Sequence, residues 1–381
     1  MRDPASSPLR AELAALDPTL RATLDDHGFA IDRFLALVDQ LRAGALTPGS
    51  GRLTGSVTPP RSDELTSLPA PGSAARARLE ARGRQAIARG EVGACILAGG
   101  MATRFGGLVK AAVEVTGGRS FLDLKLADLA RLGAQLGVTI PALVMTSVAT
   151  DAPVAALVAG ARAVTVFSQS VALRVTPEGY LFYETGGQPS LYAPGHGDLT
   201  DALRRSGALA EFLAAGGRHL LMSNVDNLAA TLEPAVIGAH LEAVDAGAAM
   251  TVEVVDKAPG DRGGAPARVD GRLRIVEAFL FPEDVDQDRF TVFNTNTFVL
   301  DARAIDRDFP LPYHAVVKTV DERPTVQFER LVGELTVSLP ARFLRVAREG
   351  PDGRFLPIKE PEDLERSRAA LAELLAARGL L

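Results

Sequence analysis

The sequence predicts an α/β fold built on a mostly parallel sheet with helices on both sides. From Val92 onward, short apolar runs alternate with stretches of helical spacing. The runs VGACILA, PALVMTS and VTVFSQ are almost continuously apolar, which is typical of strands buried on both faces. The stretch between the first two runs is long enough to form the crossover helix that neighbouring parallel strands require.

The first 90 residues are expected to form a helical extension. Apolar residues have helical spacing over 9–16 and 29–41, next to Pro, Asp and Gly at the ends. Residues 44–72 are rich in Pro, Gly, Ser and Thr and have no periodicity, so a surface linker is expected there. A helix resumes at about Ser73, a residue type that caps helix N-termini, and leads into the first strand.

Later elements complete the predicted sheet. Further buried strands are expected over 219–223, 249–255 and 292–300. The tail EPEDLERSRAALAELLAARGLL opens with acidic residues and closes with Arg and Gly, as the dipole of a terminal helix favours. We therefore expect a central domain over 91–340 and a C-terminal segment over 341–381.

Composition excludes several classes of function. Lys and Arg number 41 against 47 for Asp and Glu, a net charge of −6 that argues against a nucleic-acid partner. The single cysteine, Cys95, has no partner for a disulfide or a zinc cluster. No apolar stretch approaches the roughly 20 residues that cross a bilayer, and MRDPASSPLR has no signal-peptide core, so a cytoplasmic protein without a membrane partner is expected.

The sharpest feature is the glycine-rich turn in ACILAGGMATRFGGLVKAAVEV. The strand ends at Ala98, and Gly99 and Gly100 allow backbone N–H groups to approach phosphate oxygens closely. Arg104 and Lys110 add positive charge. The spacing fits neither GxGxxG nor GxxxxGK[ST], which disfavours a Rossmann dehydrogenase and a P-loop ATPase. Taken alone, the turn is equally consistent with an ordinary strand-to-helix connection.

Five later segments follow this turn in order. They are FSQS at 167–170, YAPGHGDL at 192–199, SNVDNL at 223–228, FNTNTFVL at 293–300 and FLPIKEPEDL at 355–364. Together with LAGGMATRFG and the lysine after it, they resemble the UDP-sugar pyrophosphorylase family over about residues 92–365, most closely its members that act on glucose-1-phosphate. The resemblance implies a Rossmann-like nucleotidyltransferase fold of the glycosyltransferase A type, with a mixed, mostly parallel sheet in the central domain.

The resemblance also implies a reaction in which a sugar-1-phosphate oxygen attacks the α-phosphorus of UTP and pyrophosphate leaves. Because two anions must meet, positioning and electrostatics dominate over acid–base catalysis. By resemblance, Arg104 and Lys110 would hold the β- and γ-phosphates, and Lys359 would contact the α-phosphate and the sugar phosphate. Asp226 would bind Mg²⁺, which proteins usually hold with one or two carboxylates plus phosphate oxygens and water.

Binding residues are implied on both sides of the reacting phosphate. The residues implied for the nucleotide are Ala98, Gly99, Gly100, Gln169 and Gly195. A Gln side chain offers a donor and an acceptor that match the imide edge of uracil. The residues implied for the sugar phosphate are His196, Gly264, Glu277 and Asn296. Histidine suits phosphate oxygens, whereas Glu and Asn suit hydroxyl groups.

Each role has a structural alternative. Asp226 would also serve as a turn cap, and Lys359, with acidic neighbours, as a solvated surface residue. FNTNTFVL is also consistent with a plain strand that presents Asn294 and Asn296 on one face, one of them structural.

Two positions depart from the family pattern, which usually has Gly where Ala102 stands and Pro where Val109 stands. A positive φ at Ala102 would cost about 1 kcal/mol or more. The chain ends soon after Lys359 and leaves no room for the C-terminal β-helix domain of eukaryotic relatives, so a monomer or weak oligomer is expected.

Several alternatives for function stay open. The sugar is open between glucose, N-acetylglucosamine and galactose, each as the 1-phosphate. A non-catalytic nucleotide-binding protein of the same fold is the alternative outside catalysis. A glycosyltransferase is disfavoured, because SNVDNL contains no DxD pair.

Overall fold

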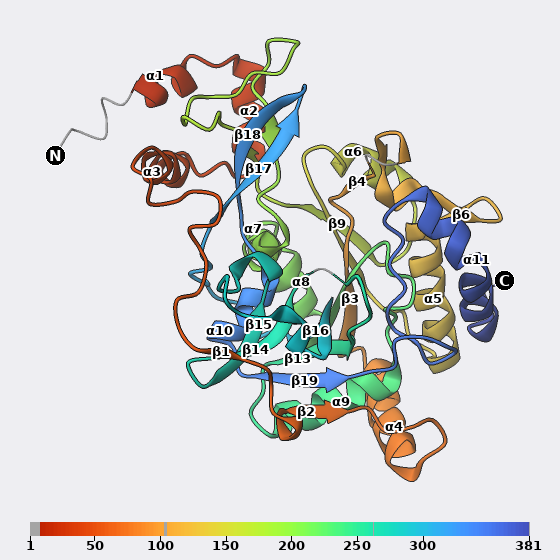
Figure 1. The fold of residues 1–381 in the computed structure, drawn as a ribbon. Helices are drawn as coiled ribbons and strands as arrows, with labels where there is room; N and C mark the ends of the chain where they lie inside the picture. Colours follow the sequence, from red (N-terminus) through yellow and green to blue (C-terminus); the bar gives the residue numbers. More distant parts are fainter. Residues whose placement is uncertain (1–7, 103–104, 262, 381) are drawn as a thin grey trace.

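The fold is arranged around one eight-stranded sheet (Figure 1). The structure is a computed structural model that describes residues 8–102, 105–261 and 263–380. In spatial order the strands are β2 (Leu65–Ser67), β19 (Ala341–Arg345), β13 (Met250–Asp256), β16 (Val292–Asp301), β12 (His219–Asn224), β3 (Val92–Leu97), β8 (Ala142–Thr146) and β9 (Val164–Ser168). The pairings are parallel except those made by β16. This confirms the predicted mixed, mostly parallel sheet.

Helices cover both faces of the sheet. One face is covered by α4 (Ala74–Ala88), α5 (Phe121–Leu136), α9 (Pro234–Asp245) and α11 (Pro361–Ala377), the other by α7 (Leu199–Arg205), α8 (Ala208–Ala214) and α10 (Leu335–Ser338). Strand β3 shows why its sequence is continuously apolar. Ala94 and Ile96 pack into the core on the side of α4, α5, α9 and α11. Cys95 and Leu97 pack into the core on the side of α7, α8 and α10. Cys95 is thus a buried free thiol.

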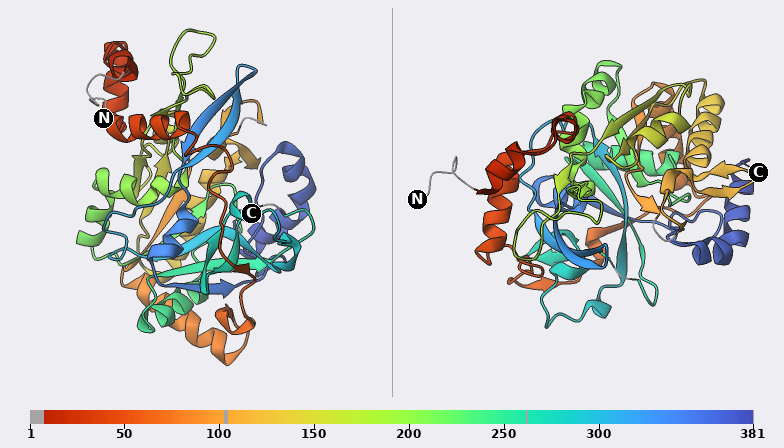
Figure 2. Two further views of the ribbon diagram at one scale, coloured as in Figure 1. Left: turned by 60° about the vertical axis from the view of Figure 1, so that its left-hand side comes forward. Right: turned by 90° about the horizontal axis from the view of Figure 1, so that it is seen from above.

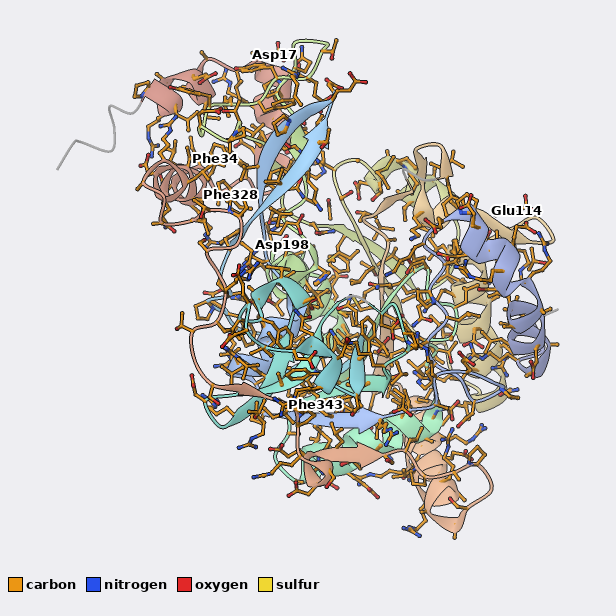
Figure 3. All side chains as sticks on the ribbon, in the orientation of Figure 1. Asp17, Phe34, Glu114, Asp198, Phe328 and Phe343 are labelled. Atoms are coloured by element: carbon orange, nitrogen blue, oxygen red, sulfur yellow. The ribbon has the colours of Figure 1, made fainter. Side chains whose placement is uncertain are left out.

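A third, smaller core lies away from the sheet. The helices α1 (Pro8–Ala14), α2 (Pro18–Asp26) and α3 (Ile31–Arg42) pack against the hairpin of β17 (His314–Val320) and β18 (Arg323–Glu329). Phe34 and Phe328 both lie in this core (Figure 3). In both views of Figure 2, these red helices lie on the opposite side of the molecule from the blue α11.

The remaining elements are short. They are α6 (Asp151–Leu157), β1 (Val57–Thr58) beside the hairpin β14 (Ala265–Val269) and β15 (Arg272–Val276), and the pairs β4 (Met101–Ala102) with β5 (Leu108–Val109), β6 (Glu114–Thr116) with β7 (Arg119–Ser120), and β10 (Ala172–Leu173) with β11 (Leu191–Tyr192). Among the helices of the described residues, none is long and apolar enough to span a membrane.

The strands predicted from continuous apolar runs are confirmed as β3, β8, β9, β12, β13 and β16. Ser73 is the N-cap of α4, because its side chain accepts a hydrogen bond from the backbone N–H of Arg76.

The structure differs from the prediction at both ends of the central domain. Residues 44–72, predicted as a linker, contain β1 and the edge strand β2, which pairs with β19. Strand β19 lies inside the sheet although it falls in the predicted C-terminal segment. An edge strand as short and exposed as LTS leaves no apolar run in the sequence.

Candidate active site

The carboxyl ends of β3, β12 and β9 gather the predicted nucleotide motifs at one edge of the sheet. β3 and β12 are parallel neighbours, and Leu97 pairs with Asn224 at their last residues. The glycine turn follows β3, and the Asp226 loop, which connects β12 to α9, follows β12. The turn and the loop therefore begin side by side. Gln169 directly follows β9. Open α/β sheets bind ligands at this edge.

The glycine turn is held by its backbone. The N–H of Ala98 donates to a carbonyl of β8 at 2.7 Å, and Ser147 Oγ donates to the carbonyl of Gly99 at 2.8 Å. The N–H of Lys110 donates to the carbonyl of Gly100 at 3.2 Å, which closes the loop between them. A Cβ on Gly100 would meet nothing within 4 Å. The turn therefore leaves open space beside Gly100, where the resemblance implies a phosphate.

Between these glycines and Lys110, two short strands form. Ala102 lies in β4 opposite Leu108 of β5. It is extended there, so the replacement of glycine by alanine does not require a positive φ. The predicted phosphate-binding residue Arg104 lies outside the described residues.

Gln169 packs directly against the turn. Its Nε2 donates to the carbonyl of Thr146 at 3.3 Å, and a Cβ on Gly99 would lie 2.4 Å from that nitrogen. The side chain is 6% exposed, and its buried Oε1 has no hydrogen-bond partner within the described part of the chain. A buried, unused amide acceptor costs free energy unless a ligand satisfies it.

Lys110 and Asp226 meet across the two motifs. Lys110 Nζ lies 2.6 Å from Asp226 Oδ2, and both side chains are largely buried. The other oxygen, Asp226 Oδ1, is buried without a hydrogen-bond partner among the residues that the structure describes. The same residues contain no group of three or more His, Cys, Asp or Glu side chains that could hold a metal ion. The buried Oδ1 of Asp226 fits an ion bound by one carboxylate together with ligand oxygens, as Mg²⁺ often is.

The segment with Lys359 is attached to the Asp226 loop. The N–H of Ile358 donates to the carbonyl of Asp226 at 3.1 Å, and Asn227 Oδ1 accepts from the N–H of Leu356 at 3.0 Å. Lys359 is exposed, and its own N–H donates to a carboxylate at the start of α11. The structure therefore places Lys359 next to Asp226 through backbone contacts.

Gly195 and His196 lie where the chain passes β18. Gly195 has φ 87°, and a Cβ there would be 2.8 Å from the carbonyl of Arg330. The N–H of Val332 donates to His196 Nδ1 at 3.0 Å. Burial lowers the pKa of His196, so the ring is neutral at pH 7 and its remaining proton is on Nε2. His196 can therefore donate one hydrogen bond from Nε2.

Gly264 and Glu277 lie against each other. A Cβ on Gly264 would be 2.7 Å from Glu277 Oε1. Burial raises the pKa of Glu277 to about 7, and the nearby charge of Glu334 adds to this shift. The carbonyl of Gly264 accepts from the N–H of Asn294, which links this pair to β16.

Asn296 lies in an irregular part of β16. The register against β13 shifts between Val252 and Val254, and Asn296 has φ 54°. Its Nδ2 donates at 3.0 Å to Oδ1 of Asn224, which stands two residues before Asp226 in the sequence. The N–H of Asn296 donates to Asn294 Oδ1, so these two asparagines contact each other.

Hydrogen bonds thus join Gly264, the asparagines of β16 and the Asp226 loop. Sequence reasoning missed Asn224 and Asn227, although both stand beside Asp226 in SNVDNL and their amide groups were a visible signal. It also missed Lys125, whose Nζ donates to Ser223 Oγ and to the carbonyl of Ala230. A lysine inside the apolar helical pattern FLDLKLADLARL gives no signal of these contacts.

Comparisons with known proteins decide the family. The family described as UTP–glucose-1-phosphate uridylyltransferase matches residues 63–378. The chain belongs to this family. The uridylyltransferase of Encephalitozoon cuniculi is 29% identical over 281 residues, which cover 70% of this chain and 56% of that protein. The one of Saccharomyces cerevisiae is 30% identical over 300 residues, with 70% and 57% covered. The chain therefore spans a little over half the length of these relatives.

Solved structures of other proteins support the fold. The UDP-glucose phosphorylase of Trypanosoma brucei matches with a TM-score of 0.72 at 21% identity, covering 94% of this chain and 77% of that one. The predicted α/β fold, with a mostly parallel central sheet flanked by helices, is thus confirmed.

Proposed function

We propose that this chain is a UTP–glucose-1-phosphate uridylyltransferase that forms UDP-glucose and pyrophosphate. The observation that carries the proposal is the meeting of three motifs at one sheet edge. The glycine turn provides open backbone next to Lys110, Lys110 pairs with Asp226, and the backbone of Asp226 holds the Lys359 segment. Family membership gives independent support.

In this proposal, the phosphate oxygen of glucose-1-phosphate attacks the α-phosphorus of UTP. The bond between the α-phosphorus and the oxygen that bridges to the β-phosphorus breaks, and that oxygen leaves with pyrophosphate. Neither substrate has to form a covalent bond with the protein. The protein therefore accelerates the reaction by alignment and by placing positive charge near the leaving group.

One set of residues binds the nucleotide. Gln169 reads uracil, because its buried Oε1, which has no hydrogen-bond partner in the described part of the chain, can accept from the imide N–H. Gly99, Gly100 and Ala98 bring the backbone close to the phosphates. Gly195, whose φ suits glycine, completes the nucleotide pocket beside β18.

Charged groups act on the phosphates. Lys110 and Arg104 bind the β- and γ-phosphates, and Lys359 reaches the α-phosphate from the segment attached to Asp226. Asp226, whose Oδ1 has no hydrogen-bond partner among the described residues, would hold Mg²⁺. When bound, Mg²⁺ neutralises phosphate charge and fixes oxygen geometry.

The sugar phosphate lies on the opposite side of the α-phosphorus. His196 donates from Nε2 to its phosphate, and Glu277, Gly264 and Asn296 contact its hydroxyls and ring. The hydrogen-bond chain from Gly264 through β16 to Asn224 ties these groups to the Asp226 loop.

The direct test is turnover. Purified protein is incubated with UTP, Mg²⁺ and glucose-1-phosphate, and pyrophosphate release is measured. N-acetylglucosamine-1-phosphate and galactose-1-phosphate are run in parallel to settle the sugar. Asp226→Asn should lower kcat by about 10²- to 10³-fold, whereas Asp245→Asn, at an exposed ion pair on α9, should leave it unchanged. No release with any sugar phosphate would contradict the proposal.

We further propose that the protein acts in the cytoplasm as a monomer or weak oligomer, without nucleic-acid or membrane partners. The net negative charge argues against a nucleic-acid partner. Light scattering of the purified chain measures its oligomeric state directly.

A further inference from the structure

Behind the loop that carries Asp226 lie three cationic side chains, of which Lys125 and Arg354 are buried and Arg378 is half-buried. We infer that Lys125, Arg354 and Arg378 form a support that positions Asp226 for the reaction, an inference that rests on the proposed function. Lys125 comes from α5, Arg354 precedes the Lys359 segment, and Arg378 follows α11. The three segments are distant in sequence, yet their cations converge on one loop.

The contacts cover four consecutive carbonyl groups of that loop, residues 228–231. Arg378 donates to Leu228 at 2.8 Å and to Ala229 at 3.2 Å, Lys125 donates to Ala230 at 2.6 Å, and Arg354 donates to Thr231 at 2.9 Å. Hydrogen bonds from charged donors are stronger than those between neutral groups. The stretch after Asp226 is therefore fixed by its carbonyl groups.

Lys125 also holds the stretch before Asp226. Its Nζ donates to Ser223 Oγ at 2.9 Å, as well as to the carbonyl of Ala230. One ammonium group thus bridges the two ends of the loop, three residues before Asp226 and four residues after it. Lys125 is 5% exposed, and Ser223 is 3% exposed, so water does not compete for these bonds. Movement of the loop would break both of them.

The charges around Lys125 show that it is not there for an ion pair. Arg354 pairs with the buried carboxylate of Glu253, but neither Lys125 nor Arg378 has a carboxylate within 4.0 Å among the described residues. Asp128, one turn further along α5, pairs with Arg131. Retaining an ammonium without such a partner is costly, and burial, followed by the charge of Arg378, lowers the pKa of Lys125 to about 7.

The free-energy cost of burying Lys125 is explained if this lysine helps to position Asp226. Its hydrogen bonds hold the backbone on both sides of Asp226, while Lys110 and ligands act on the carboxylate itself. A loop that shifts by about 1 Å can lose 10²-fold in rate, because the reacting groups no longer align. Lys125 is therefore a positioning residue that does not contact substrate.

The test compares Lys125→Met with Lys257→Met. Lys257 also donates to a backbone carbonyl, that of Gln287, so its removal is a matched loss of a lysine-to-carbonyl bond away from the Asp226 loop. Lys125→Met should lower kcat by about 10- to 100-fold and raise the Mg²⁺ concentration for half-maximal rate, with the KM for glucose-1-phosphate within about twofold. Lys257→Met should match the wild type in all three.

If Lys125 had a merely structural role, Lys125→Met would lower Tm and leave kcat and the Mg²⁺ requirement of the folded protein unchanged. That result overturns the inference. Should Lys125→Met not fold, Ser223→Ala removes one of the two bonds and keeps the ammonium. It should shift kcat and the Mg²⁺ requirement in the same direction by a smaller factor, and wild-type values there overturn the inference as well.

Hydrogen exchange separates this inference from the proposed function. It is measured on the protein without substrate, so it needs no activity. Amides of residues 223–231 should exchange at least about tenfold faster in Lys125→Met than in the wild type. Unchanged exchange overturns the inference even if the wild type releases pyrophosphate. Faster exchange supports the role of Lys125 in holding the loop even if the wild type releases no pyrophosphate.

Discussion

Replacement of Gly99 by alanine should damage uracil recognition through the side chain of Gln169. The added Cβ would lie 2.4 Å from Gln169 Nε2 and 3.2 Å from the carbonyl of Thr146. Carbon and nitrogen do not approach so closely, and the backbone of Thr146 belongs to a buried strand, so the Gln169 side chain has to turn away. Its bond to Thr146 is then lost, and its amide no longer faces the base.

The magnitude follows from the bonds at stake. An amide can make two hydrogen bonds to uracil, each with a net value of about 0.5–1.5 kcal/mol. Their loss, about 1–3 kcal/mol, corresponds to a rise of about 5- to 150-fold in the KM for UTP. Preference for UTP over CTP should fall by a similar factor, because the clash removes the group that distinguishes the bases.

Steady-state kinetics with UTP and CTP measure both effects. Gly186→Ala is the matched control, since a Cβ there meets nothing within 4 Å and the position is exposed in a distant turn. A folded Gly99→Ala protein with wild-type KM and wild-type base preference would refute the assignment of Gln169.

Three further predictions follow from buried charge and from the Lys359 segment. Lys359→Ala should lower kcat by about 10²- to 10³-fold, and a change in KM alone would show that Lys359 binds ground and transition states equally. Glu277 holds its proton up to about pH 7 when folded but only to about 4.5 when unfolded, so stability should fall as pH rises through this window. Glu277→Gln should remove that fall, on the order of 1–3 kcal/mol, and parallel Tm curves from pH 5 to 8 would contradict it. Arg354→Met should lower the unfolding free energy by about 3–5 kcal/mol, because it leaves a buried carboxylate without its partner. Arg345→Met, which removes an exposed ion pair, should lower it by about 0–1 kcal/mol. Equal urea midpoints for the two variants would show that burial is not the cause.

The strands of the sheet interior could be predicted because burial on both faces leaves a signal in the sequence. VGACILA is apolar at every position, since alternate residues of β3 enter different cores. Strand β2 left no such signal: its three residues lie at the sheet edge and are mostly exposed. Strand β19, with ARFLR, buries only the two adjacent side chains of Phe343 and Leu344, and an arginine stands on each side of them.

The candidate site could be predicted where one motif carries the chemistry. Gly99, Lys110 and Asp226 stand in short segments whose order along the chain is visible, and the structure brings the last two together. Asn296 could not be placed by strand alternation, because it has a positive φ and lies where the register against β13 shifts. Lys125 could not be predicted, because its bonds depend on how α5 packs under a loop 98 residues away.

A crystal structure of the chain with UTP and Mg²⁺ tests the central claim most directly. We predict that the uracil contacts Gln169, that the β- and γ-phosphates lie along residues 99–110, and that the metal contacts Asp226. A uridine bound at a different edge of the sheet, away from residues 99–110, would contradict the account.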